Sequence, residues 1–225
     1  MKITAVIPIR IGSQRVKNKN LKPFGDTTLL SFKIDNLLKV KGIDEIIVNT
    51  DSDEAIEIAK AKGVSFHKRE AYFASSECTT GEFFVHMGEV TQTDIFAYCP
   101  CTSPFIQPAT IDASIKTFLD SHANDSLATV SSVKEFLWLD GKPVNYEHNN
   151  MPASQNLPNI CALNFGLSLI SRLDLIKYRN IVGVRPLFML TDEIESLDID
   201  TPFDFYIAEQ VYCSLKDGSL KQKYA

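Results

Sequence analysis

The sequence predicts an α/β fold with a doubly wound, mostly parallel sheet and an extended arm or small subdomain inserted near residues 134–164. Three observations lead to this prediction. Segments with strand and helix patterns alternate along the first part of the chain. The first segment, "ITAVIPI" at 3–9, is a continuous apolar run, which is typical of a strand buried on both faces. Between 134 and 164, the chain is rich in Asn and Pro and lacks helical periodicity.

The expected elements begin with the strand at 3–9 and a helix at 28–40. Apolar side chains recur along that helix on one face, at positions Leu29, Leu30, Ile34, Leu37 and Leu38. Gly42 ends the helix, and the apolar segment "DEIIVNTD" at 44–51 gives a second buried strand.

A second helix is expected at 52–63, where Ser52 can cap the N-terminus, acidic residues occupy the first turn and Gly63 ends the helix. The elements that follow are a short strand at 64–68, a loop, a helix around 79–90, a strand at 94–101, a Pro-led helix at 108–122 and a strand at 126–133. This βαβαβ order predicts parallel strands with helices on both faces of the sheet.

Residues 134–164 interrupt the alternation. A disordered linker is one interpretation, but several large side chains favour an ordered excursion: Trp138, Leu139, Tyr146 and Leu157. Such an arm often packs on a second subunit, so we expect a homodimer with 134–164 as its dimerisation arm. Beyond the arm we expect a helix near 172–178 and a final helix around 205–212. Because no linker divides the chain, we expect a single domain over residues 1–225.

Composition and charge exclude several classes of protein. The chain has 225 residues, of which 44% are hydrophobic and 23% charged, as in an ordinary soluble protein. A net charge of −5 argues against a general nucleic-acid or membrane-surface binder. No apolar run approaches the roughly 20 residues that span a bilayer, and the N-terminal segment lacks a signal-peptide cleavage site. We therefore expect a cytoplasmic protein with no nucleic-acid or membrane partner.

The five cysteines are expected to be reduced thiols. Their number is odd, and their spacing matches no disulfide framework. Cys99 and Cys101 form a C-x-C pair, but no second pair or histidine completes a zinc site.

The informative polar residues cluster after the ends of expected strands, at 10–20, 50–51, 102–103 and 198–200. In a doubly wound sheet, ligands bind beyond the carboxyl ends of the strands. The clusters therefore predict a binding site at that edge of the sheet.

The cluster at 10–20 predicts phosphate binding. Gly12 and Ser13 can turn the backbone so that several N–H groups face one anion. The side chains that can supply charge-assisted bonds to phosphate oxygens are Arg10, Arg15, Lys17 and Lys19. A solvated basic loop is the alternative, and the spacing matches neither the Walker A motif nor the G-x-G-x-x-G fingerprint.

The stretch "IPIRIGSQRVKNKNL" at 7–21 closely resembles the signature loop of the acylneuraminate cytidylyltransferase family, which reads roughly I-P-A-R-x-G-S-K-R-x-x-x-K-N-L. The positions in register are Arg10, Gly12, Ser13, Arg15, Lys19, Asn20 and Leu21. Four further stretches are similar to family motifs in the same order: "VNTDSDEAIEIAKAKG", "KREAYFASSECTTGEF", "TSPF" and "SLDIDTPFDFYIAE". The similarity spans almost the whole chain and implies a Rossmann-like nucleotidyltransferase.

The resemblance implies that CMP is transferred from CTP to a small acidic sugar, such as a sialic acid or another keto-deoxy sugar acid. The sugar's hydroxyl attacks the α-phosphate and pyrophosphate leaves, a reaction that needs positioning and charge neutralisation more than covalent help. The implied catalytic residues are Arg10, Lys19 and Asp200. The implied nucleotide-binding residues are Arg10, Gly12, Ser13, Lys19, Asn20, Arg69 and Thr79.

By resemblance, Asp198 and Asp200 hold Mg²⁺, the expected cofactor. The spacing agrees, because alternate residues on a strand share a face and two hard oxygen ligands would converge on one spot. An exposed acidic strand face is the alternative interpretation. Asp204 is expected to be structural, capping the final helix. The sequence gives no partner for His67 or His86, so neither is assigned a catalytic role.

The resemblance assigns three residues to the acceptor sugar: Thr102, Ser103 and Gln155. This half of the site departs from the family pattern. Pro100 stands where the family has a glutamine, and Ser154 and Ala162 stand where sialic-acid enzymes carry arginine. Because arginine is the natural bidentate partner of a sugar carboxylate, we expect N-acetylneuraminate to be a poor acceptor.

Two other functions stay open. An enzyme of the same fold could transfer a nucleotide to a different sugar or to a sugar phosphate. A degenerate member of the family could bind nucleotide without turnover, although the presence of both Lys19 and Asp200 argues against this.

Overall fold

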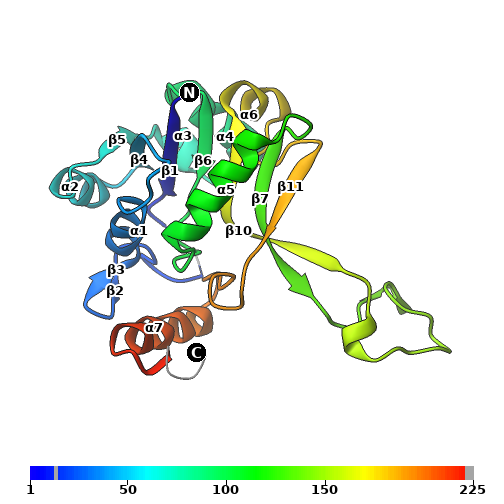
Figure 1. The fold of residues 1–225 in the computed structure, drawn as a ribbon. Helices are drawn as coiled ribbons and strands as arrows, with labels where there is room; N and C mark the ends of the chain where they lie inside the picture. Colours follow the sequence, from blue (N-terminus) through cyan, green and yellow to red (C-terminus); the bar gives the residue numbers. More distant parts are fainter. Residues whose placement is uncertain (13–14, 221–225) are drawn as a thin grey trace.

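The computed structural model describes residues 1–12 and 15–220. At its centre is a seven-stranded sheet in the order β11-β7-β10-β6-β1-β4-β5 (Figure 1). The strands of this sheet are β1 (Ile3–Ile9), β4 (Glu45–Thr50), β5 (Ser65–Lys68), β6 (Ile95–Tyr98), β7 (Ser126–Val133), β10 (Ile160–Ser171) and β11 (Pro186–Leu190).

The strand directions confirm the mostly parallel sheet. β1 pairs in parallel with β4 and β6, β4 pairs in parallel with β5, and β7 does so with β11. Among the described strands of this sheet, only β10 runs the other way, lying antiparallel between β6 and β7. The carboxyl ends of β1, β4, β5 and β6 therefore meet at one edge.

Helices cover both faces of the sheet, as the alternation predicts (Figure 1). They are α1 (Leu29–Leu37), α2 (Asp53–Ala61), α3 (Ala71–Ala74), α4 (Thr80–Val90), α5 (Pro108–Asp120), α6 (Arg172–Tyr178) and α7 (Pro202–Lys216). Ser52 caps α2 as expected, its hydroxyl accepting from the Ala55 N–H at 3.2 Å. The structural role expected of Asp204 is confirmed, because it forms a capping box with Thr201 at the start of α7. Across residues 1–12 and 15–220, no helix is long and apolar enough to cross a membrane.

Several elements differ from the expectation. β6 ends at Tyr98 rather than at residue 101, because Pro100 has no N–H to donate to a neighbouring strand. Residues 71–74, expected to be part of a loop, form the single turn of α3. β11 was not expected, since a run of five residues that starts with proline is too short for an argument from periodicity.

Two apolar clusters fill the space between the sheet and its helices. β1 contributes to both, because successive side chains on a strand point to opposite faces. Ala5 and Ile7 belong to the cluster under α1, α2, α5 and α7, whereas Val6 belongs to the cluster under α4 and α6. This two-sided burial explains why the segment reads as a continuous apolar run.

The arm projects away from the sheet beyond the ends of β7 and β10 (Figure 1). It carries the short strands β8 (Trp138–Leu139) and β9 (Lys142–Pro143) and the 3₁₀ turn η1 (Ser154–Asn156). Tyr146 packs between Phe136 and Trp138, with ring centroids 5.1 and 6.2 Å apart. The excursion is thus structured, but its last expected residues, 160–164, belong to β10, where Ile160 pairs with Val133.

A small hairpin joins the basic loop to α1. It consists of β2 (Pro23–Phe24) and β3 (Thr27–Thr28), with Gly25 between them at a φ of +59°. A Cβ at Gly25 would lie 2.5 Å from Cε1 of Tyr212 in α7, so a larger residue would push the helix away. The Tyr212 hydroxyl also donates to Asp26 at 2.7 Å. The hairpin is therefore docked directly on the C-terminal helix.

Candidate active site

Two adjoining cavities lie at the carboxyl ends of β1 and β6. The larger, of about 420 Å³, is lined by Arg10, Arg15, Lys19, Asn20, Thr102 and Asp200 together with Pro8 and Val16. The smaller, of about 190 Å³, shares Pro8, Arg10, Asn20 and Thr102 with it and adds Arg69, Phe83 and Tyr98. Because they share four residues, we treat the two cavities as one and call them the strand-end groove. Its position is the one predicted from the polar clusters.

The basic loop leaves β1 through a turn at Gly12, whose φ is +90°. This left-handed conformation is the one that glycine adopts without strain. Just before the turn, the Ile11 N–H donates to the carboxylate of Asp51 at 2.8 Å, which ties the loop to the end of β4. Ser13 lies outside the described residues. Arg10 is exposed and lines both parts of the groove.

Lys19 is held at the floor of the groove. Its side chain is buried, and its Nζ donates to the backbone carbonyl of Ile199. The same Nζ lies 4.0 Å from Oδ1 of Asp200. Burial lowers the pKa of Lys19 from its ordinary value, and the nearby carboxylates of Asp200 and Asp198 oppose that shift. A cation held this way is suited to offset charge on a bound phosphate.

Asp198 and Asp200 approach the groove from the far end of the chain. The expectation that they lie on a strand is wrong, since residues 197–200 have no regular secondary structure. The Ile199 N–H donates to Thr102 O at 2.8 Å, but Thr102 itself lies in a turn, so this contact does not extend the sheet. The alternation survives: Ile199 is fully buried, while the carboxylates on either side of it are only partly covered.

The two carboxylates have different partners. Asp200 accepts from Arg15 Nη2 at 2.9 Å, and both side chains are largely exposed. Asp198 Oδ1 lies 3.5 Å from the Ser103 hydroxyl. Burial raises the pKa of Asp198, and the neighbouring negative charge of Asp200 adds to that shift. A cation placed near both carboxylates would relieve this repulsion.

Asn20 and Arg69 extend the groove toward β4 and β5. Asn20 Oδ1 is buried and has no hydrogen-bond partner among residues 1–12 and 15–220. A buried acceptor without a partner is costly, and a donor on a bound ligand would remove that cost. Arg69 is 5% exposed, and its guanidinium lies over the Phe83 ring at 4.5 Å. Burial lowers its pKa to about 10, so Arg69 stays charged at neutral pH.

The remaining expected site residues do not all lie in the groove. Thr102 lines the groove, but the neighbouring Ser103 is buried and its hydroxyl already donates to Asn164 O at 3.2 Å. Thr79 caps α4, where its hydroxyl donates to Glu82 at 2.6 Å, and it does not line the groove. Gln155 lies on the arm, in η1. The structure therefore brings six expected site residues to the groove, but it leaves Thr79 and Gln155 apart from them: the six are Arg10, Lys19, Asn20, Arg69, Thr102 and Asp200.

Two features were missed by sequence reasoning. His67 does have a partner, because its Nδ1 lies 3.1 Å from Asn49 Nδ2. Lys33 is fully buried in α1, and its Nζ donates to Ser103 O at 2.6 Å. The signal for Lys33 was present in the sequence, because it falls four residues after Leu29 on the apolar face of the helix.

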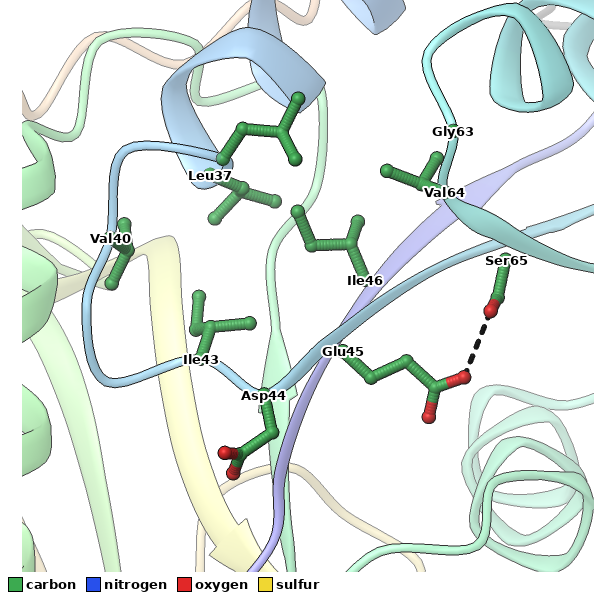
Figure 2. Close-up of a pocket in the computed structure, with 10 residues that line it drawn as sticks. Leu37, Val40, Ile43, Asp44, Glu45, Ile46, Gly63, Val64 and Ser65 are labelled. Atoms are coloured by element: carbon green, nitrogen blue, oxygen red, sulfur yellow. Dashed lines mark hydrogen bonds between the residues drawn. The ribbon is translucent and has the colours of Figure 1, made fainter.

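A third hollow, of about 320 Å³, lies at the opposite edge of the sheet, where β4 begins. Figure 2 shows apolar side chains around it, among them Leu37, Ile43 and Val64. Its charged groups are two carboxylates: Glu45 accepts from Ser65 at 2.9 Å and from Lys2 at 2.7 Å, and Asp44 accepts from the Ile3 N–H at 2.7 Å. With apolar walls and carboxylates that are already paired, this hollow is unsuited to a nucleotide.

The chain is similar to proteins of one family. A sequence model described as cytidylyltransferase matches residues 4–150, more than half of the chain. Post-translational flagellin modification protein B from Campylobacter coli is 27% identical, and the alignment covers 98% of each chain. N-acylneuraminate cytidylyltransferase from Escherichia coli is 26% identical over 92% of this chain and 51% of that enzyme. CMP-N,N'-diacetyllegionaminic acid synthase from Legionella pneumophila is 26% identical over 94% of this chain and 96% of that one.

Solved structures show the same fold. CMP:2-keto-3-deoxy-manno-octonic acid synthetase complexed with CTP gives a TM-score of 0.70 at 16% identity, covering 95% of this chain and 99% of that one. A 4-diphosphocytidyl-2C-methyl-D-erythritol synthase from Anaerococcus prevotii also gives 0.70, at 15% identity, over 94% and 96% of the two chains. The fold expected from the order of strands and helices is therefore confirmed.

Proposed function

Because the chain belongs to the cytidylyltransferase family and is a CTP-dependent nucleotidyltransferase, we propose that it transfers CMP from CTP to the hydroxyl of an acidic sugar. The acceptor would be a sialic-acid-like or other keto-deoxy sugar acid. One observation carries the proposal: the strand-end groove places Arg10, Lys19 and Arg69 around one space, with Asp200 at its edge. The similarity to an N-acylneuraminate cytidylyltransferase and to a CMP-N,N'-diacetyllegionaminic acid synthase supports it.

In the proposed reaction, the sugar's hydroxyl oxygen bonds to the α-phosphorus of CTP, and the hydroxyl proton passes to water. The bond from that phosphorus to the bridging oxygen breaks, and the electron pair leaves with pyrophosphate. Negative charge therefore grows on the leaving group. Arg10 and Lys19 line the space where the triphosphate would lie, so they would offset that charge without any rearrangement of the fold. The turn at Gly12 would bring backbone N–H groups to the same phosphates.

The nucleoside part of CTP would occupy the smaller end of the groove. Asn20 Oδ1, which has no partner among the described residues, can accept from an amine or hydroxyl of the nucleotide. Arg69 uses Nε and one Nη2 proton on Asn49, which leaves its other N–H groups for the ligand. These two residues are assigned to nucleotide binding in the proposal, together with Gly12 and Ser13 of the loop.

The donors present fit Mg²⁺ as the proposed cofactor. Asp198 and Asp200 supply two carboxylates, and no group of three or more potential metal-binding side chains occurs within residues 1–12 and 15–220. A magnesium ion commonly takes one or two carboxylates and completes its shell with water and substrate phosphates. When bound, it would polarise the phosphate oxygens and neutralise charge on them. Arg15, now paired with Asp200, would be free to turn toward the phosphates.

The acceptor half of the site is the divergent one. Thr102 and Ser103, and Gln155 on the arm, are the residues proposed to face the sugar. Ser154 and Ala162 stand where the resemblance expects arginine. Arg172 is not placed to compensate, because it donates to Gly88 O at 2.6 Å, near the amino ends of the strands. We therefore propose an acceptor other than N-acetylneuraminate.

We further propose that the enzyme is a cytoplasmic homodimer in which the arm packs on the second copy. Trp138, Leu139 and Met151 on the arm are 51%, 66% and 61% exposed, which is costly in an isolated chain and typical of a surface that a partner covers. In this proposal, 1–225 is a single domain and 134–164 its dimerisation arm.

A second candidate is a nucleotidyltransferase of the same fold that acts on a different sugar or a sugar phosphate. This candidate is supported by the methylerythritol synthase, whose TM-score equals that of the sugar-acid synthetase. The test is pyrophosphate release with each nucleoside triphosphate and Mg²⁺ across a panel of sugar acids and sugar phosphates. Release with CTP and a sugar acid supports the proposal. Release only with a sugar phosphate supports the second candidate, and nucleotide binding without release would indicate a degenerate enzyme.

A further inference from the structure

The guanidinium of Arg69 is held by a single residue of the neighbouring strand. Arg69 Nε donates to Asn49 Oδ1 at 2.6 Å, and Nη2 donates to the backbone carbonyl of Asn49 at 2.7 Å. Asn49 is 1% exposed. An arginine side chain has donors only, so the atom of Asn49 that faces it has to be the oxygen. This fixes the orientation of the Asn49 amide.

With its oxygen on Arg69, Asn49 presents its NH₂ group to His67. These two residues are direct neighbours across β4 and β5, and Nδ2 of Asn49 lies 3.1 Å from Nδ1 of His67. An NH₂ group only donates, so Nδ1 of His67 has to be the acceptor. An imidazole accepts only when it is neutral, with its proton on Nε2. Asn49 therefore links Arg69 to a neutral histidine.

The surroundings of His67 favour that neutral form. Burial lowers the pKa of His67, and the charge of Arg69 lowers it further, while Glu70 has the opposite effect. The ring of His86 in α4 lies 5.5 Å away and stacks on Phe73 at 3.7 Å. Burial also lowers the pKa of His86; the charges of His67 and Arg69 lower it further, whereas Glu70 and Glu89 have the opposite effect. Burial and the Arg69 cation thus oppose a proton on His67, and Glu70 favours one.

We propose that Asn49 and the neutral imidazole of His67 are positioning residues that hold Arg69 in its nucleotide-binding orientation. The inference deepens the proposed function and rests on it, because it assumes that Arg69 binds CTP. A proton on Nδ1 would set two donors against each other, and Asn49 could then satisfy His67 only by turning its oxygen away from Arg69. CTP binding should accordingly weaken as the pH falls.

The sign of the effect follows from the direction of the pKa shift. A histidine whose pKa is lowered by the fold is still neutral at its unfolded value of about 6.5 and takes up a proton only as the pH falls to the lowered pKa. The contact, and the stability it contributes, is therefore present at pH 7 and above and is lost as the pH falls through the lowered pKa of His67.

The experiment compares the KM for CTP of the full-length enzyme from about pH 5.5 to about pH 8, with CTP affinity measured in parallel by calorimetry. Because the terminal phosphate of CTP titrates in the same range, the wild type is compared with His67→Asn, whose side chain keeps an acceptor near the Nδ1 position and takes up no proton. We expect the wild-type KM for CTP to rise about tenfold more than that of His67→Asn at the acid end. The exposed His122→Asn is the matched control and should follow the wild type.

Two further variants separate this inference from the proposed function. His67→Phe, which removes the acceptor, should raise the KM for CTP at every pH with kcat little changed, and His67→Asn should reverse that rise at pH 8. Arg69→Ala gives the full effect of losing the guanidinium. If Arg69→Ala raises KM but wild type and His67→Asn have the same pH profile, the positioning role is wrong and the nucleotide role of Arg69 stands. If Arg69→Ala leaves the KM for CTP unchanged, the positioning role of Asn49 and His67 and the nucleotide role of Arg69 are both wrong.

Discussion

The strand-end groove buries charged side chains, whereas the arm exposes apolar ones. In the groove, charged groups such as Lys19 and Arg69 are buried and bonded to backbone carbonyls of other segments. On the arm, Trp138 and Leu139 are apolar and exposed. The groove is thus complete within one chain, whereas the arm leaves its apolar surface uncovered. Under the proposed function, the difference means that the nucleotide half of the site is preorganised within one chain, whereas Gln155, proposed for the acceptor half, lies on the arm that the proposed dimer would cover.

The largest expected effect tests whether the groove is a catalytic centre. Asp200→Asn removes one of the two proposed Mg²⁺ ligands, so turnover should fall by about 10³-fold or more. The fold should persist, because the carboxylate is largely exposed and its partner Arg15 is exposed as well. Steady-state kinetics with Mg²⁺, with Mn²⁺ and with a chelator measure the effect, and the exposed Asp120→Asn serves as control. Full activity of Asp200→Asn would show that Asp200 is not a metal ligand.

The acceptor side should give the next largest effect. Two missing charge-assisted contacts, at about 1.5–3 kcal/mol each, would reduce kcat/KM for N-acetylneuraminate by roughly 10²- to 10⁴-fold relative to the preferred acceptor. Side-by-side kinetics with N-acetylneuraminate and related sugar acids decide the matter. Efficient turnover of N-acetylneuraminate, above roughly 10⁴ M⁻¹s⁻¹ in kcat/KM, would show that Ser154 and Ala162 are not the determinants proposed.

Within the groove, Lys19→Ala should reduce kcat by about 10²-fold, because charge grows on the leaving pyrophosphate beside this side chain. The exposed Lys39→Ala provides a matched control, for which kinetics should not change. Rapid-quench measurement of the chemical step separates the loss from slower product release. If kcat for Lys19→Ala matches the wild type, the basic loop is a solvated surface and not a phosphate site.

The smallest effect on the monomer is expected in the arm. Substituting Trp138 and Leu139 by Ser should change the free energy of unfolding of the monomer by no more than about 0.5 kcal/mol, because both side chains are exposed. The same double variant should weaken a dimer by about tenfold or more, since exposed aromatic residues often anchor interfaces. Sedimentation measures the dissociation constant of the dimer, and thermal unfolding measures the stability of the monomer fold. If the double variant dimerises like the wild type, the arm does not form the dimer interface.

Sequence reasoning succeeded where a pattern has one physical cause. Strands such as β1 are buried on both faces and read as apolar runs, and Ser52 and Asp204 occupy cap positions that their side chains favour. The backbone turn expected at Gly12 and Ser13 is seen at Gly12, where φ is +90°. These features depend on neighbours in the chain, so they could be predicted without knowing the fold.

It failed where the cause lies elsewhere in the chain. The segment of Asp198 and Asp200 resembles a strand, but its neighbour in space is a turn at Thr102 and not another strand. The bond between Asn49 and His67 exists only because β4 and β5 are adjacent with these residues in register. Lys33 falls on the apolar face of α1 in the sequence, but its partner, the carbonyl of Ser103, is 70 positions away in the chain. Each of these contacts is fixed by tertiary packing, which a single sequence does not display.

The bond from Lys19 to Ile199 joins residues 180 positions apart. At about 5–20 residues per second, a ribosome needs roughly 10–35 s to make that intervening length. During this time the strands that follow one another early in the chain can pair, but Arg15 and Lys19 lack the Asp200 carboxylate that lies beside them in the complete fold. A nascent or prematurely terminated chain would therefore carry most of the sheet but not the complete groove, which needs Asp200. The order of synthesis makes catalytic competence the last property that this protein acquires.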